Sequence, residues 1–349
     1  MSKGKKKNTS ASRVRKSAEK KKERQNVAKH STILFWFTAI ALVGIFVGRW
    51  YTAIGSGYFS SFVEIDAATP TAVSNMKGLV PTEEEKALLL PLQRQWDLYT
   101  SSRLRDEVTV TAEDGAELHA YYYDEGGDVT VIVLPRFSQD GTADFLPGVF
   151  LRELTDCNLL LPDPREHGGS AGGYFTYGVR ERNDIAVWTA WADETFGPQR
   201  YILWGEGTGA NTALLAAADG ALPDSVAFIV AESPYESLRE LANDRIWSWY
   251  SVPRIFLLAV ESKLTKAGFT LDDVELARTL EASETDVPVL FLYSTEDSYI
   301  DPAWSEGVIA AYPGPAETVA GTGTHEAMYA QCRSDWETAL TRWWAAYGK

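Results

Sequence analysis

Hydrophobic and polar positions divide the chain into three regions of different character. Residues 1–30 are almost wholly polar, and residues 31–48 form a run of 18 residues without a charge. As a helix, that run is about 27 Å long, close to the thickness of the hydrocarbon core of a bilayer. From residue 52 onward short apolar segments alternate with polar ones, which is typical of a globular domain.

The uncharged run is bracketed by features typical of a membrane boundary. Lys29 and Arg49 flank it, and Trp50 and Tyr51 stand where an aromatic belt forms at the lipid–water interface. A buried core helix would need apolar neighbours, which the polar tail does not supply. A cleaved signal peptide would have a shorter basic region and a small-residue cleavage site after Gly48. We therefore predict an uncleaved transmembrane anchor over residues 31–51.

Residues 52–104 are predicted to form a stalk near the membrane followed by a helix. Thr82 can cap that helix, and Glu85, three residues on, completes a capping box. Pro91 is expected to kink the helix.

The pattern of a sheet begins near residue 105. Residues 107–112 and 117–123 alternate around Glu113-Asp114-Gly115, which predicts a hairpin. Later apolar runs are continuous, as in strands covered on both faces. Because helical patterns lie between them, we predict an α/β fold, with a mostly parallel central sheet and helices on both faces. The continuous runs are residues 129–134, 158–161, 200–204, 226–231 and 287–293, followed by a short strand over 317–320 and a Trp-rich helix over 326–347.

Residues 236–280 interrupt this alternation with a predicted helical insertion before the seventh strand. They combine aromatic and aliphatic residues with polar breaks. A cap over the C-terminal edge of the sheet and an ordinary pair of surface helices are both open interpretations.

Charge is distributed as unevenly as the apolar residues. The formal net charge is −15, but residues 1–30 hold 12 Lys and Arg against two acids, and the remainder holds 21 basic and 46 acidic residues. The positive-inside rule places residues 1–30 in the cytoplasm and the main domain outside the cell membrane. We expect a disordered tail near acidic lipid headgroups. Because topology accounts for its charge, no nucleic-acid partner is expected.

Several kinds of site are excluded by what the sequence lacks. Two cysteines, Cys157 and Cys332, give no disulfide framework or metal cluster, and we expect both to be buried thiols rather than a disulfide. The Gly-rich segment 205–209 lacks the spacing of a dinucleotide loop. We predict no cofactor and no metal.

Candidate chemistry lies after the predicted strands, because parallel sheets form their sites at the C-terminal ends of strands. The run Gly205-Glu206-Gly207-Thr208-Gly209 connects a strand to a helix, which is the context of a nucleophile elbow. Asp297 follows the next-to-last strand and His325 follows the last one. The order of elbow, acid and histidine is that of the α/β hydrolases.

Residues 105–349 therefore resemble the α/β-hydrolase superfamily. They are most similar to an exported or membrane-anchored branch that shares features with monoacylglycerol lipases and serine aminopeptidases. The motifs that carry this resemblance, in chain order, are DPREHGGSAG at residues 163–172, Tyr177-Gly178 with Glu181 and Asp184, and Tyr235-Glu236-Ser237.

The resemblance implies a Ser–Asp–His triad from which the serine is missing. Asp297 takes the acid position, His325 the base position and Gly207 the nucleophile position. Glycine has no side chain, so no acyl-enzyme can form there. Ser170 stands in a literal G-x-S-x-G, but no helix start follows it, and the resemblance makes it a loop residue. Two further candidate nucleophiles, both less favoured, are Thr208 and Ser233.

The oxyanion hole is altered as well. The branch has His-Gly after the third strand, where this chain has Pro135-Arg136-Phe137. Proline removes one N–H donor, which leaves the N–H groups of Phe137 and Thr208 as candidates. Arg136 could instead fill the site by pairing with Glu206.

Three hypotheses follow for the function. The first is a membrane-anchored, catalytically impaired homologue that binds a small molecule or a protein partner. The second is an active hydrolase of ester, amide or lipid-like substrates, working through an atypical nucleophile or through water activated by His325 and Asp297. The third is a structural envelope protein whose pocket has closed.

Overall fold

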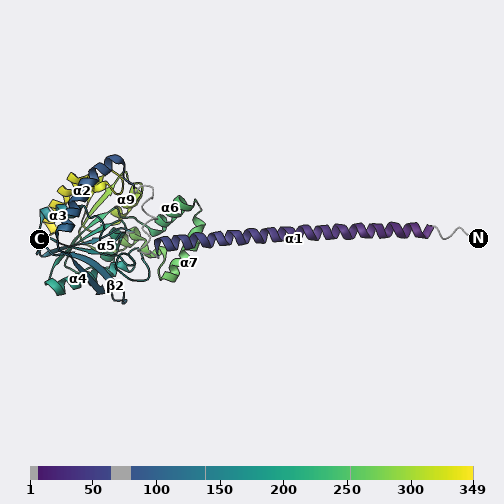
Figure 1. Ribbon diagram of the computed structural model, residues 1–349, viewed down its shortest axis with the longest axis horizontal. Helices are drawn as coiled ribbons and strands as arrows, with labels where there is room; N and C mark the ends of the chain where they lie inside the picture. Colours follow the sequence, from purple (N-terminus) through teal and green to yellow (C-terminus); the bar gives the residue numbers. More distant parts are fainter. Residues whose placement is uncertain (1–6, 64–79, 138, 252, 349) are drawn as a thin grey trace, which may run out of the picture. The chain divides into compact units, whose positions relative to one another are not determined.

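The computed structural model describes residues 7–63, 80–137, 139–251 and 253–348, and the chain divides into two units, residues 1–54 and 55–349 (Figure 1). Helix α1 (Lys7–Phe62) makes up the first unit and continues into the second. The prediction of disorder in residues 1–30 is wrong for residues 7–30, which are helical and, from residue 12 on, exposed. Lys, Arg, Glu, Gln and Ala favour the helix, and the segment contains no Gly or Pro. Residues 1–6 lie outside the described part.

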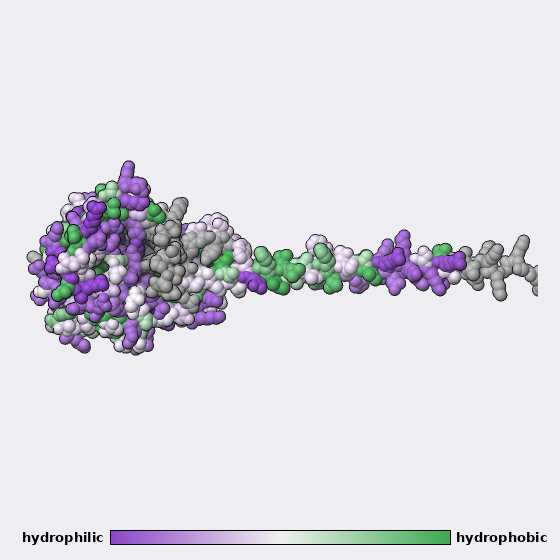
Figure 2. All heavy atoms as spheres, in the orientation of Figure 1, coloured by the Kyte–Doolittle hydropathy of each residue, from purple (hydrophilic) through white to green (hydrophobic). Residues whose placement is uncertain are grey.

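The apolar stretch of α1, residues 31–48, is exposed except at the half-buried Ala39. Phe35, Trp36 and Phe46 are 65%, 61% and 70% exposed, and Figure 2 shows a largely hydrophobic stretch of the long helix next to a hydrophilic one. A core helix of a soluble domain would bury such residues. Among the described residues, this helix is the one long and apolar enough to cross a membrane, judged by length and composition.

The C-terminal end of α1 belongs to the second unit and packs into it. Tyr58 and Phe59 are buried, and Gly55 lies so close to Ala259 that an added Cβ would come within 2.8 Å of the Ala259 Cβ. The prediction of a stalk from residue 52 is therefore wrong for residues 55–63. Its remaining residues, 64–79, lie outside the described part.

One eight-stranded sheet, in the order β1-β2-β4-β3-β5-β6-β7-β8, forms the centre of the second unit. The predicted hairpin of β1 and β2 is confirmed, and β2 pairs antiparallel with β4. All later neighbours are parallel, as the continuous apolar runs predict. The strands are β1 (Asp106–Thr111), β2 (Glu117–Tyr123), β3 (Val129–Leu134), β4 (Asn158–Pro162), β5 (Arg200–Glu206), β6 (Val226–Glu232), β7 (Val289–Ser294) and β8 (Ala316–Gly321).

Helices cover both faces of the sheet. On one face, α2 (Glu83–Ser102), α3 (Pro147–Leu154) and α11 (Arg333–Tyr347) share an apolar core with the strands, in which Trp96, Trp204 and Trp336 are buried. On the other face, α5 (Thr208–Ala218) packs on β5 and β6, with α4 (Glu181–Phe196) and α8 (Leu276–Glu281) beside it. Helix α9 (Pro302–Ala311) follows β7.

Three predictions about individual helices can be compared with the structure. The capping box of Thr82 and Glu85 is present, and α2 continues through Pro91 rather than ending there. The predicted C-terminal helix is divided at Cys332 into α10 (Met328–Gln331) and α11. The insertion before β7 is helical, as predicted, and consists of α6 (Leu238–Tyr250), η1 (Arg254–Phe256), α7 (Leu257–Ala267), η2 (Leu271–Val274) and α8.

Candidate active site

The ends of β7 and β8 bring Asp297 and His325 together. The two side chains are buried, and Nδ1 of His325 lies 2.6 Å from Oδ2 of Asp297. The other carboxylate oxygen of Asp297 accepts hydrogen bonds from the N–H groups of Tyr299 and Ile300, at 2.8 and 2.9 Å. Burial alone would raise the pKa of Asp297, but the facing His325 and these N–H donors outweigh burial and lower it. The acid is thus held as a carboxylate that fixes the histidine ring.

Gly207 occupies the sharp turn between β5 and α5. Its φ of 49° and ψ of −105° are sparsely populated for residues with side chains. The turn is tight because the glycines on either side allow the backbones to touch. A Cβ on Gly209 would lie 1.9 Å from the carbonyl oxygen of Leu134, and one on Gly205 would lie 2.5 Å from the Gly209 backbone. The local sequence therefore builds a tight turn from strand to helix, the backbone context of a nucleophile elbow, around a residue that has no side chain.

A narrow cavity lies directly at this turn. Gly207, Thr208, Phe137 and His325 line it, so the structure places the predicted nucleophile position, both predicted oxyanion donors and the base around one space. Its volume of about 20 Å³ is enough for roughly one water molecule. The other lining residues are Tyr58, Arg136, Tyr177, Tyr235, Leu241, Arg245, Tyr299 and Ile300.

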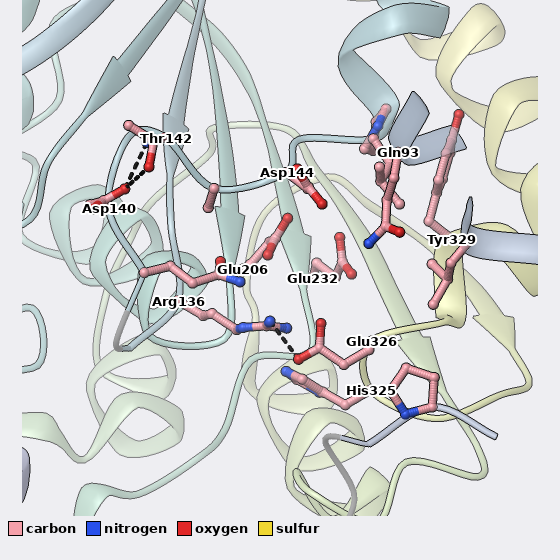
Figure 3. Close-up of a pocket in the computed structure, with 16 residues that line it drawn as sticks. Gln93, Arg136, Asp140, Thr142, Asp144, Glu206, Glu232, His325, Glu326 and Tyr329 are labelled. Carbon is pink, nitrogen blue, oxygen red and sulfur yellow. Dashed lines mark hydrogen bonds and ion pairs between the residues drawn. The ribbon is translucent and has the colours of Figure 1, made fainter. Parts of the chain in front are cut away.

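A much larger cavity, of about 560 Å³, reaches the same histidine from the side of α2. Figure 3 shows Glu206, Glu232 and Glu326 pointing into it beside Arg136 and His325. Its volume falls within the range of small-molecule sites, roughly 300–1,000 Å³. Asp140, Asp144, Gln93 and Tyr329 line the remainder, with apolar contributions from Pro81, Leu89, Leu146 and Pro147.

The ion-pair partner predicted for Arg136 is wrong. Arg136 pairs with Glu326, with Nη2 2.5 Å from Oε1, because Glu326 directly follows His325 and is carried to the cavity on the same loop. Arg136 lines both cavities, and its Cβ would lie 3.6 Å from a Cβ added to Gly207. The Arg136 side chain therefore fills part of the site, as expected, but its ion-pair partner is Glu326 rather than Glu206.

Two carboxyl groups at adjacent strand ends share this larger cavity. Glu206 ends β5 and Glu232 ends β6, and the two are register partners. Burial raises the pKa of Glu206, with Arg136 opposing the rise. Burial and the neighbouring Glu206 raise the pKa of Glu232 well above its usual value. Burial therefore favours the protonated, uncharged forms of these two carboxyl groups.

The remaining candidate serines have different surroundings. The hydroxyl of Ser233 lies 3.5 Å from Oδ2 of Asp297, so Ser233 contacts the acid of the pair. Ser170 donates a hydrogen bond to the carbonyl of Asp163 and accepts one from the His119 N–H, each at 2.8 Å. Ser170 thus holds its loop against the sheet edge.

Glu85 connects α2 to the histidine loop. Its carboxylate accepts hydrogen bonds from the N–H groups of Thr82 and Thr324, both at 2.7 Å. Burial alone would raise the pKa of Glu85, but these donors outweigh it and lower the value. Glu85 is only 4% exposed. It therefore fixes the residue immediately before His325.

We expect Glu85→Ala to lower the free energy of unfolding by about 1–3 kcal/mol, because two N–H groups lose their acceptor. The exposed neighbour Glu84 provides the control Glu84→Ala, which should change stability by less than about 0.5 kcal/mol. Urea unfolding of the full chain in detergent measures both. Equal effects would contradict the role given to Glu85.

Glu85, Glu232 and Glu326 were not predicted to lie at this site. The sequence did offer a signal for Glu232, since it directly follows the predicted strand over residues 226–231. Glu326 had one as well, because it adjoins His325 in the sequence. For Glu85 the sequence indicated only the capping role at Thr82. Its contact with Thr324 could not be predicted, because the two residues are 239 positions apart.

Both cysteines are free thiols. Cys157 is buried, and burial raises the pKa of its thiol to about 12. Cys332 is only half-buried, contrary to the expectation, and accepts a hydrogen bond from the N–H of Thr322.

An antiparallel hairpin leading into a parallel sheet, with a sharp turn from β5 into α5, is the architecture of the α/β-hydrolase fold. Solved structures agree with this assignment. The esterase Pf2001 of Pyrococcus furiosus is similar with a TM-score of 0.58 and 20% identity, over 72% of this chain and 94% of the esterase. The α/β hydrolase GrgF of Penicillium sp. sh18 is similar with a TM-score of 0.52 and 19% identity, over 70% of this chain and 100% of GrgF.

Comparison with curated proteins identifies relatives whose own names state no function. The chain is 31% identical over 181 residues to the uncharacterized protein YqkD of Bacillus subtilis (strain 168), which covers 50% of this chain and 58% of YqkD. It is 26% identical over 231 residues to the uncharacterized protein YfhR of Salmonella typhi. That match covers 61% of this chain and 72% of YfhR. The chain thus spans little more than half the length of YqkD. No protein-family model matches.

Proposed function

We propose that this protein is a membrane-anchored, catalytically impaired member of the α/β hydrolases that binds a small ligand outside the cytoplasm. The proposal rests on the residues at the C-terminal edge of the sheet. The turn of the elbow and the His325–Asp297 pair are intact, while the residue at the elbow is Gly207. Without a side chain there, the covalent route of a serine hydrolase is closed.

Anchoring is the second part of the proposal. The exposed apolar stretch of α1 and the basic residues before it support a single-pass span, with the N-terminus in the cytoplasm and residues 55–349 outside. The partners in this proposal are the membrane and one small molecule or protein. Nucleic acid has no part in it.

The ligand site in this proposal is the 560 Å³ cavity. Among the described residues that line it, Arg136 is the one guanidinium, and it is already paired with Glu326, while Glu206 and Glu232 lie beside that pair. We propose a ligand with amine or hydroxyl groups facing these acids and with another group near His325.

A specific observation favours a second candidate function, a weak hydrolase that uses water. The cavity at Gly207 is about 20 Å³ and is lined by His325, which suits one water molecule beside a base held by Asp297. Substrates would be esters, amides or lipid-like molecules.

A fluorophosphonate probe tests the proposed loss of the nucleophile. We expect the wild-type chain, in membranes, to remain unlabelled under conditions in which an active serine hydrolase is labelled completely. Strong labelling that disappears with Ser233→Ala or Thr208→Val would overturn the proposal. Unlabelled protein with ester hydrolysis that disappears in His325→Gln would favour the water-based function.

A further inference from the structure

Three large apolar side chains are exposed on the helical insertion. Trp247 on α6, Ile255 on η1 and Leu258 on α7 are 61%, 63% and 57% exposed. We call these three residues the insertion patch. Exposed apolar residues gathered within a dozen positions of one another, one of them tryptophan, are typical of surfaces that contact a partner or a membrane.

The surroundings of the insertion patch show where it lies in the second unit. Leu258 is followed by Ala259, which packs directly against Gly55 at the C-terminal end of α1. Buried neighbours Phe256, Leu257 and Val260 fix η1 and α7 to the domain. The patch therefore borders the place in the second unit where Ala259 meets Gly55 of α1.

The length of chain between the apolar run and this point is short. Gly55 lies seven positions after Gly48, a distance of about 10 Å in a helix. The polar interface of a bilayer extends roughly 5–7 Å beyond the hydrocarbon core on each side. Any anchor built on residues 31–51 thus keeps Gly55 and Ala259 within reach of that interface.

We propose that the insertion patch docks into the interface of the same bilayer that holds the chain's own anchor, with Trp247, Ile255 and Leu258 at the level of the lipid headgroups. The inference rests on the anchoring proposed above. The exposed Arg254, paired with Glu240, stands between the apolar residues, and an arginine stem suits the boundary between lipid and water. Docking brings the cavity at Gly207, which α6 lines through Leu241 and Arg245, close to the lipid phase.

Site-directed spin labelling of the full chain in proteoliposomes tests this docking. Cys332→Ser removes the accessible thiol, and buried Cys157 remains in place. Labels are attached at Leu258→Cys and Trp247→Cys, with Leu98→Cys as the matched control. Leu98 is 69% exposed on α2, a helix that packs on the sheet away from α7. Accessibility is measured with oxygen, which partitions into lipid, and with a water-soluble nickel chelate.

We expect the ratio of oxygen to nickel accessibility to be several-fold higher at positions 258 and 247 than at position 98. In one outcome, the chain resists alkaline carbonate extraction and still gives the same ratio at positions 258 and 247 as at position 98. That result would overturn the docking and leave the anchor intact. Protection from both reagents would also overturn it, in favour of a protein that covers the patch. Release of the chain by carbonate would overturn the anchor itself, and the docking with it.

Discussion

Gly207→Ser is expected to turn the chain into a fluorophosphonate-labelled esterase. The backbone at residue 207 already has the φ and ψ of a strained turn, and a Cβ there meets only the Cβ of Arg136, at 3.6 Å. His325 lines the same cavity, so the new hydroxyl would lie beside its base. Assistance by a positioned histidine contributes roughly 10²–10⁴-fold. We expect hydrolysis of a p-nitrophenyl ester to rise by about that factor over wild type.

Two matched variants separate chemistry from strain. Gly207→Ala adds the same Cβ at the same positive φ, at a cost of about 1–3 kcal/mol of stability, and should remain inactive. Gly207→Ser combined with His325→Gln should lose most of the gained activity and labelling. A Gly207→Ser chain that is folded, unlabelled and inert would contradict the inherited architecture of the site.

The oxyanion region limits how far activity can rise. Pro135 has no N–H to donate, and Arg136 occupies space next to residue 207. The loss of one donor costs roughly 10²–10³-fold in rate. Gly207→Ser should therefore remain well below the activity of a complete serine hydrolase.

The parts of this structure that sequence could predict are those decided locally. Continuous apolar runs identified the strands, because a β-strand that is buried on both faces of the sheet carries apolar residues at successive positions. The elbow was recognisable because Gly205 and Gly209 each permit a backbone approach that a Cβ would block. Asp297 and His325 could be placed because both follow strands of a parallel sheet, whose ends meet at one edge.

The parts that could not be predicted depend on contacts between distant segments. Arg136 and Glu206 were matched by charge, but the loop that carries His325 places Glu326 closer. Gly55 meets Ala259 of α7, and the ring of Phe59 meets that of Tyr174, and no local pattern near residue 55 reveals these contacts. Disorder was predicted for residues 7–30 because their low apolar content prevents them from forming a core. A helix can form without a core when the helix propensity of its residues is high.

Arg165→Gln is expected to destabilise the chain by about 3–5 kcal/mol, because breaking a buried ion pair leaves a charge without its partner. Arg165 is 3% exposed, and its guanidinium donates to both oxygens of Asp184, at 2.8 and 2.7 Å. It also pairs with Asp114 in the β1–β2 turn, at 2.6 Å. The variant leaves the carboxyl of Asp184 buried without a cation. Urea unfolding in detergent gives the free energy of unfolding.

The pH dependence of this loss has a defined sign. Burial raises the pKa of Asp184 to about 6 even with Arg165 present, and without Arg165 the pKa should rise further. A group whose folded pKa lies above its unfolded value takes up a proton preferentially in the folded state, so the variant gains stability as pH falls toward about 4. The deficit should therefore be largest near neutral pH and shrink in acid. A deficit that grows in acid would contradict the assignment of the loss to Asp184.

A surface pair provides the matched control for Arg165. Arg333 and Glu337 form a partly exposed pair one helical turn apart, and Arg333→Gln should cost less than about 1 kcal/mol. The difference matters for the site because Arg165 ties down the loop between β4 and α4. That loop carries Phe175 and Tyr177, and Tyr177 stacks on Phe137 at 5.6 Å. Loss of Arg165 should therefore loosen the wall of the cavity at Gly207, and in the Gly207→Ser background it should lower esterase activity, whereas Arg333→Gln should not.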